Sequence, residues 1–133
     1  MSDPIPADAQ EALYIVLAQP NITIVKSYVS HDLANLRWAF PSDPLFARAI
    51  EATAKEILRA LKSPATFGRM FEHDLGSWRR SSYHSRPERE ADLRLIFRPQ
   101  FDGDGIDIIG FGRRHLPDTT SIYRIVANRL KRV

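Results

Sequence analysis

The chain has 133 residues, 44% of them hydrophobic and 26% charged, which suits one domain with a real core and excludes two ordinary domains or a disordered chain. It contains no cysteine, which excludes disulfides and thiolate metal sites and is compatible with a reducing cytoplasm, the compartment we expect. The net charge of +3 is mild but unevenly spread along the sequence. The charged residues among the first twenty are all acidic, whereas the segment after position 112 contains six basic residues and one acidic residue.

Residues 1–20 are predicted to be an N-terminal extension that holds one short helix between prolines. The extension has no early Lys or Arg, so it lacks the charged region of a signal peptide. Its longest apolar run, residues 12–18, is far shorter than the roughly 20 residues of a membrane helix, and we expect no membrane contact. Residues 21–133 are predicted to form the main domain.

The main domain begins with a predicted strand and two predicted helices. Residues 22–28 alternate β-branched residues with Thr and Lys and predict the strand, and residues 31–40 have the apolar spacing of a short helix. Asp43 as N-cap and Pro44 in the first turn then predict the start of a long helix. Its apolar stripe consists of Phe46, Ile50, Ala54, Ile57 and Leu61. Its charged residues, including Glu56, lie mostly outside that stripe.

Two further strands joined by a tight loop occupy residues 92–115. In the first, Leu93, Leu95 and Phe97 are predicted to lie on one face, and Arg94, Ile96 and Arg98 on the other. The second, from residue 106, is apolar on both faces and suits the sheet centre. Upstream, residues 76–84 predict another strand and residues 85–92 an exposed loop.

Residues 117–120 are predicted to cap a final helix whose apolar stripe is Ile122, Val126 and Leu130. The order of elements predicts an α+β fold, with helices packed on a small, mainly antiparallel twisted sheet. The basic C-terminal end either faces a polyanionic partner or is a solvated surface. The chain has no phosphate-binding GxxxxGK[ST] loop, GxGxxG, HExxH or EF-hand motif, and its histidines lack metal-ligand spacing, so no metal site is predicted.

Three motifs occur in a set order. The long helix closes in LKSP at residues 61–64. Residues 75–80 (LGSWRR) and 92–97 (DLRLIF) form a pair of strands, and residues 108–114 (IIGFGRR) precede Tyr123. In order and spacing these motifs resemble the RelE/ParE superfamily, the toxin halves of bacterial type II toxin–antitoxin pairs, over about residues 22–130. The sequence departs from the family pattern at Leu93, before the strand arginine, and in the longer connection at residues 85–92.

The resemblance implies a RelE/ParE-like fold and, in the RNA-cleaving branch, ribosome-dependent cleavage of mRNA by its own 2′-hydroxyl without a cofactor. It also implies a cognate antitoxin. Arginine holds its proton and clamps phosphate, so Arg94 and Arg114 are assigned to phosphate stabilisation. Tyr123 is assigned to base stacking or proton transfer. His84 and His115 titrate near neutrality, so either could be the general base or acid.

Four more basic residues are candidate RNA contacts: Arg79, Arg80, Arg98 and Arg113. Adjacent strand residues face opposite sides, so only one of each adjacent pair can face the site, and the choice of Arg114 over its neighbour follows the family pattern.

Structural roles compete with the catalytic ones. Arg94 could form a salt bridge with Asp107, Tyr123 could pack beside Ile122, and Trp78 is expected in the core. Two other functions also remain open: a gyrase-poisoning toxin of the same fold, and a non-toxic binding module. Histidines that point away from the arginines would count against the enzyme.

Overall fold

The computed structural model describes residues 5–70, 78–86, 88, 90–101, 104–114 and 121–131. The elements follow the chain in this order: α1 (Pro6–Leu17), β1 (Ile22–Ile24), α2 (Lys26–Ala39), α3 (Asp43–Lys62), β2 (Arg69–Met70), β3 (Arg79–Tyr83), β4 (Leu93–Pro99), β5 (Ile106–Arg113) and α4 (Ile122–Lys131). The described strands form one five-stranded sheet in the order β1-β5-β4-β3-β2, and every neighbouring pair is antiparallel except β1 and β5. The protein is therefore an α+β fold with a mainly antiparallel sheet, as its sequence predicts.

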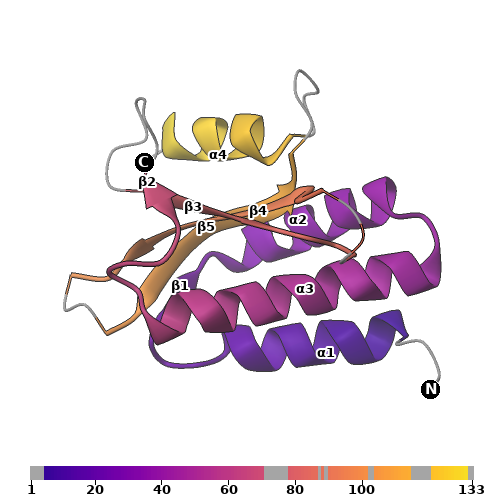
Figure 1. Ribbon diagram of the computed structural model, residues 1–133, viewed down its shortest axis with the longest axis horizontal. Coiled ribbons are helices and arrows are strands. Elements are labelled where there is room, and N and C mark those ends of the chain that lie inside the picture. Colours follow the sequence, from indigo (N-terminus) through magenta and orange to yellow (C-terminus); the bar gives the residue numbers. More distant parts are fainter. Residues whose placement is uncertain are drawn as a thin grey trace.

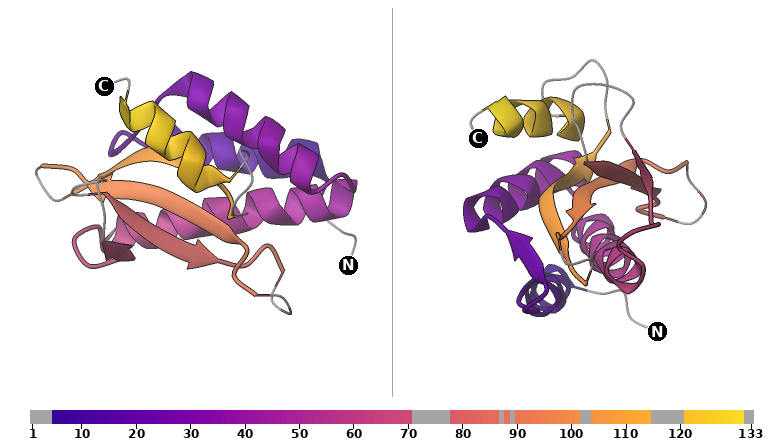
Figure 2. Two further views of the ribbon diagram at one scale, coloured as in Figure 1. Left: turned by 90° about the horizontal axis from the view of Figure 1, so that it is seen from above. Right: turned by 90° about the vertical axis from the view of Figure 1, so that its left-hand side faces the viewer.

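Helices cover both faces of this sheet (Figures 1 and 2). α4 lies on one side, which we call the α4 face, and α3 lies on the opposite side with α1 packed against it (Figure 1). Ala9 and Leu13 of α1 are buried in the main core, so the N-terminal segment supplies core surface. None of the described helices is long and apolar enough to span a membrane.

The alternation along β4 divides the core into two layers. Leu93, Leu95 and Phe97 belong to the large core on the α3 side, while Ile96 belongs to the smaller core under α4. α4 approaches the sheet closely at Gly110, where an added Cβ would lie 2.9 Å from side-chain atoms of Ile122 and Val126. The missing side chain at position 110 therefore sets how near α4 can lie to β5.

Some predicted boundaries are wrong. The strand predicted for residues 22–28 ends at Ile24, and α2 begins at Lys26, earlier than the helix predicted for residues 31–40. Val29 starts the buried stripe of α2, and the helical period therefore takes over before residue 31. The N-cap of α3 is Ser42, whose Oγ accepts a hydrogen bond from the Leu45 N–H at 3.3 Å, rather than Asp43.

Other predictions fall partly outside the described residues. The predicted strand at 76–84 corresponds to β3, which begins at Arg79, and residues 76 and 77 lie outside the described part. The predicted helix cap at 117–120 also lies outside it. β2 is not predicted from the sequence, because two residues are too few to show a period.

Candidate functional site

A buried arginine and a tyrosine meet on the α4 face. Arg94, on β4, is only 7% exposed, and its Nε donates a hydrogen bond to the Tyr123 Oη at 3.0 Å. The Arg80 Nη1, from β3, donates to the same oxygen at 3.3 Å. The register explains this convergence, because Arg80 pairs with Ile96 and Ser82 with Arg94, which places both arginines on one face. Two cations thus share one phenol oxygen.

The remaining contacts of Arg94 are with uncharged groups. Its Nη1 donates to the Ala91 carbonyl at 2.6 Å and to the Leu93 carbonyl at 2.9 Å. Among the residues that the structure describes, no carboxylate forms a salt bridge with it. Burying a cation without an anionic partner costs free energy, and a bound anion would offset that cost. The geometry therefore favours an anion-binding role for this position.

The alternative pairing of Arg94 with Asp107 is wrong. Asp107 lies opposite Arg98 in the register, and the Arg98 Nε donates to its Oδ2 at 3.0 Å. A bulge between Ile96 and Phe97 shifts the pairing of β4 with β5, which fixes this partner. Tyr123 is half-buried and joins the smaller core, but its hydroxyl faces the arginines.

A hollow of about 670 Å³ adjoins this cluster, and we call it the basic hollow. It is lined by Arg69, Arg80, Arg94, Arg114, Glu56, Phe67, Gly68, Ser81 and Ser82. Four arginines and one carboxyl group thus border the same space. This excess of positive charge suits a phosphate or another polyanion.

The carboxyl group of the basic hollow belongs to Glu56 of α3, which is 3% exposed. Glu56 is therefore buried although it lies outside the predicted apolar stripe of its helix. Burial raises the pKa of Glu56, while Ser81, Arg59 and His84 oppose the rise. The buried Ser81 Oγ has no hydrogen bond of good geometry among the described residues. A carboxyl with a raised pKa holds its proton to higher pH than an exposed carboxyl does.

We expect Glu56→Gln to flatten the dependence of stability on pH. Because the pKa of Glu56 is raised above the usual 4.5, the folded chain holds this proton to higher pH than the unfolded chain. Its contribution to the free energy of unfolding therefore falls as pH rises from 4.5 through the raised value. Urea denaturation at a series of pH values checks this. Glu11→Gln, on the exposed side of α1, is the control and should leave the slope unchanged; equal slopes for wild type and Glu56→Gln would contradict the prediction.

His84 does not line the basic hollow. His84 is exposed and lines a neighbouring hollow of about 550 Å³ along α3, which shares Glu56 and Ser82 with the basic hollow. His115 lies outside the described residues, so its predicted role stays a prediction.

The other predicted RNA contacts are spread over the sheet. Arg79 pairs with Phe97 on the α3 side, and its Nη1 donates to the Phe67 carbonyl at 3.3 Å. Arg113 is half-buried and lines a small hollow beside α2. Arg114 is exposed at the rim of the basic hollow. The structure therefore brings Arg80, Arg94, Arg114 and Tyr123 together and leaves Arg79 and Arg113 elsewhere.

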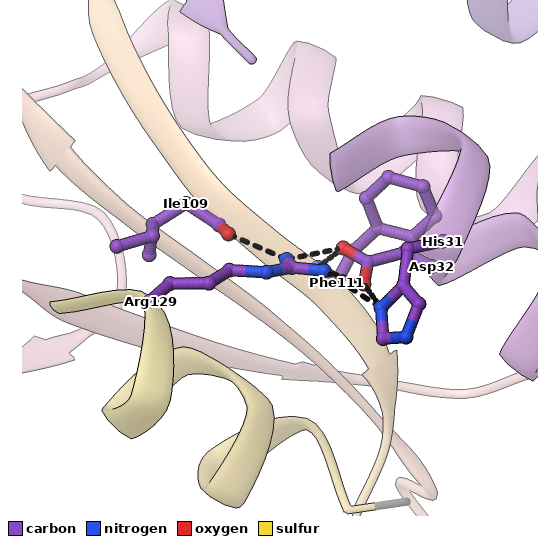
Figure 3. Close-up of polar contacts among 5 residues, drawn as sticks. All are labelled: His31, Asp32, Ile109, Phe111 and Arg129. Carbon is purple, nitrogen blue, oxygen red and sulfur yellow. Dashed lines mark hydrogen bonds and ion pairs between the residues drawn. The ribbon is translucent and has the colours of Figure 1, made fainter. Parts of the chain in front are cut away.

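A buried ion pair, not predicted from the sequence, fixes α4 (Figure 3). The Arg129 Nη2 lies 2.7 Å from the Asp32 Oδ1, and its Nη1 donates to the Asp32 Oδ2 at 3.0 Å. Arg129 also donates to the Ile109 carbonyl at 2.8 Å and contacts the His31 Nδ1 at 3.1 Å. Its guanidinium lies 4.1 Å from the centre of the Tyr28 ring. This pair joins α2, α4 and β5.

The same pair serves the edge of β5. β1 pairs with β5 only as far as Ile108, and the Phe111 N–H beyond it donates to the Asp32 Oδ2 at 3.1 Å. Asp32 accepts a hydrogen bond from the Phe111 N–H, and Arg129 donates one to the Ile109 carbonyl. Together the two side chains satisfy backbone groups of β5 that a neighbouring strand would otherwise pair with. Burial raises the pKa of Asp32, while Arg129 and the Phe111 N–H oppose the rise. α4 also carries Tyr123, so the pair holds the helix that places the phenol over Arg94.

No family model matches the chain, and no curated protein matches it. Among solved structures, the crystal structure of the isolated E. coli RelE toxin matches with a TM-score of 0.44 and 11% sequence identity, over 82% of this chain and 96% of that chain. A similarity at this level is one of fold at most, and no functional argument rests on it.

Proposed function

We propose that this chain is the toxin of a type II toxin–antitoxin system and acts as a ribosome-dependent endoribonuclease that cuts mRNA and inhibits translation. The observation that carries the proposal is the buried Arg94, which has no carboxylate partner among the described residues and meets Arg80 at Tyr123 beside the basic hollow. The sequence motifs that resemble the RelE/ParE superfamily run through the same residues. Together they favour a site for the phosphate of an RNA strand.

In the proposed reaction the 2′-hydroxyl of the RNA attacks the adjacent phosphorus, and the 5′-oxygen leaves. Negative charge on the phosphorane-like transition state is stabilised by Arg80, Arg94 and Arg114. A base takes the proton of the 2′-hydroxyl, and an acid gives one to the leaving oxygen. Among the described residues, Glu56 lines the hollow and Tyr123 meets the arginines, so these two are the candidates for proton transfer. The reaction draws on no metal or organic cofactor.

One observation favours a second candidate. His84, one of the two histidines predicted as base or acid, lines the hollow along α3 instead of the basic hollow. A gyrase-poisoning toxin of the same fold, or a non-toxic binding module, would need the basic surface without a proton-transfer group. Both toxin functions imply a cytoplasmic protein and a cognate antitoxin whose acidic segment matches the basic surface.

The test compares inducible wild type with Arg114→Ala in growing cells, with mapping of mRNA 5′ ends. Arg114 is exposed, so its loss should spare the fold while removing a phosphate contact. We expect growth arrest with new 5′ ends inside translated codons, both strongly reduced in Arg114→Ala. Arg124→Ala, an exposed arginine of α4 that does not line the basic hollow, should behave as wild type.

The other outcomes separate the candidates. Arrest with intact mRNA and broken or tangled DNA would favour gyrase as the target. Absence of arrest from a folded wild type would favour the binding module and reject the nuclease.

A further inference from the structure

Arg98 lies over the ring of Trp78 on the α4 face. Its guanidinium carbon is 4.5 Å from the centre of the indole ring, and its Nε donates to the Asp107 Oδ2 at 3.0 Å. Trp78 is half-buried and packs against the smaller core, so it is a fixed support. The Arg98 side chain nevertheless remains 45% exposed. A flexible side chain is thus restrained by two contacts while much of it still faces solvent.

The register places this pair next to the arginine cluster. Arg98 is two residues beyond Ile96 on β4, and Ile96 pairs with Arg80 on β3. Trp78 is likewise two residues before Arg80 along the chain. Two residues of a strand span about 6.6 Å, so Trp78 and Arg98 lie one same-face step from Arg80 and two steps from Arg94. One step is a distance that neighbouring nucleotides of an extended single strand can bridge.

We propose that Arg98, supported by Trp78, is a base-stacking platform for the nucleotide next to the phosphate held at Arg80 and Arg94. This inference rests on the proposed function, and it adds a base-binding subsite to a phosphate site. Proteins that bind single-stranded RNA stack unpaired bases on aromatic rings and on the planes of arginine guanidinium groups. A guanidinium is planar and weakly hydrated, which suits it to stack between an indole and a base.

A purely structural role makes a different prediction. The ion pair with Asp107 needs only a positive charge, which lysine also supplies. Stacking needs the guanidinium plane, which lysine lacks. Arg98→Lys therefore separates the two roles at constant net charge.

The experiment measures binding of a five-nucleotide single-stranded RNA with 2′-O-methyl groups, which cannot be cleaved by its own hydroxyl. The protein carries Trp38→Phe, which removes an exposed tryptophan and leaves Trp78 as the one fluorophore of its type in the chain. We expect RNA to change the Trp78 fluorescence, and Arg98→Lys to weaken binding about five- to tenfold. The salt dependence of binding should stay the same, because the charge is kept.

The matched control is a series of the same RNA in which each member has an abasic site at a different position. At one position the abasic RNA should bind wild type and Arg98→Lys equally, because it offers nothing to stack. An equal loss on intact and abasic RNA, or no loss with Arg98→Lys, would overturn the platform alone. No binding of any RNA by the folded protein would overturn the platform, whereas the proposed cleavage on the ribosome stands or falls with the mapping of mRNA 5′ ends in cells.

Discussion

Arg129→Met is expected to lower the free energy of unfolding by about 3–5 kcal/mol. The substitution keeps an unbranched apolar stem but removes the partner of Asp32, which is fully buried. An uncompensated buried carboxylate is costly, and the Ile109 carbonyl loses its donor at the same time. The loss should therefore exceed that of an ordinary surface arginine several-fold.

Urea denaturation followed by circular dichroism measures this effect. The matched control is Arg37→Met, because Arg37 pairs with Asp43 at the surface, where both side chains are largely exposed. We expect the control to cost less than about 1 kcal/mol. Replacing both Asp32 and Arg129 by apolar residues should cost less than Arg129→Met alone, since no buried charge is then left. Equal losses for Arg129→Met and Arg37→Met would show that the buried pair is not a main source of stability.

Arg94→Ala is expected to lower mRNA cleavage on the ribosome by about 10²–10³-fold. The arginine donates to Tyr123 from a nearly dry position, where a charge acts on a phosphate with little screening. The variant should remain folded, because no carboxylate among the described residues loses its partner. We expect its free energy of unfolding to fall by less than about 2 kcal/mol. A strong effect on rate with a small effect on stability is the signature of a residue kept for function.

Single-turnover cleavage of a defined ribosome–mRNA complex measures the rate, and thermal unfolding measures the stability of the same preparation. Arg94→Lys is the conservative control, and we expect it to recover only part of the rate because lysine cannot reproduce the fork of donors. A folded Arg94→Ala that cuts within tenfold of wild type would remove Arg94 from the proposed mechanism.

Much of the fold follows from periods in the sequence. The alternation of apolar residues with Arg94 and Arg98 predicts both β4 and the face on which the arginines lie. The apolar run after residue 106 predicts a central strand, and β5 lies between β1 and β4. The 3.6-residue stripe predicts α3, which has nine buried residues, Glu56 among them.

The partners of individual charges do not follow from such periods. Asp32 and Arg129 are 97 residues apart, and only the folded chain shows that they meet. Arg94 lies opposite Gly112, and a bulge shifts the register by one residue so that Arg98 lies opposite Asp107. The alternation along β4 does not reveal this register. Glu56 is buried by its neighbours in space, so its place in the helix period gives no sign of its role.

The charged pair beside β5 also bears on solubility. An uncovered run of strand N–H and carbonyl groups is a template for edge-to-edge association with another molecule. Asp32 and Arg129 form hydrogen bonds with the Phe111 N–H and the Ile109 carbonyl at this edge. A strand from another molecule could pair with these groups only by displacing the buried ion pair. Variants that lose the pair should therefore aggregate at concentrations where wild type stays dispersed, even under conditions where they remain folded.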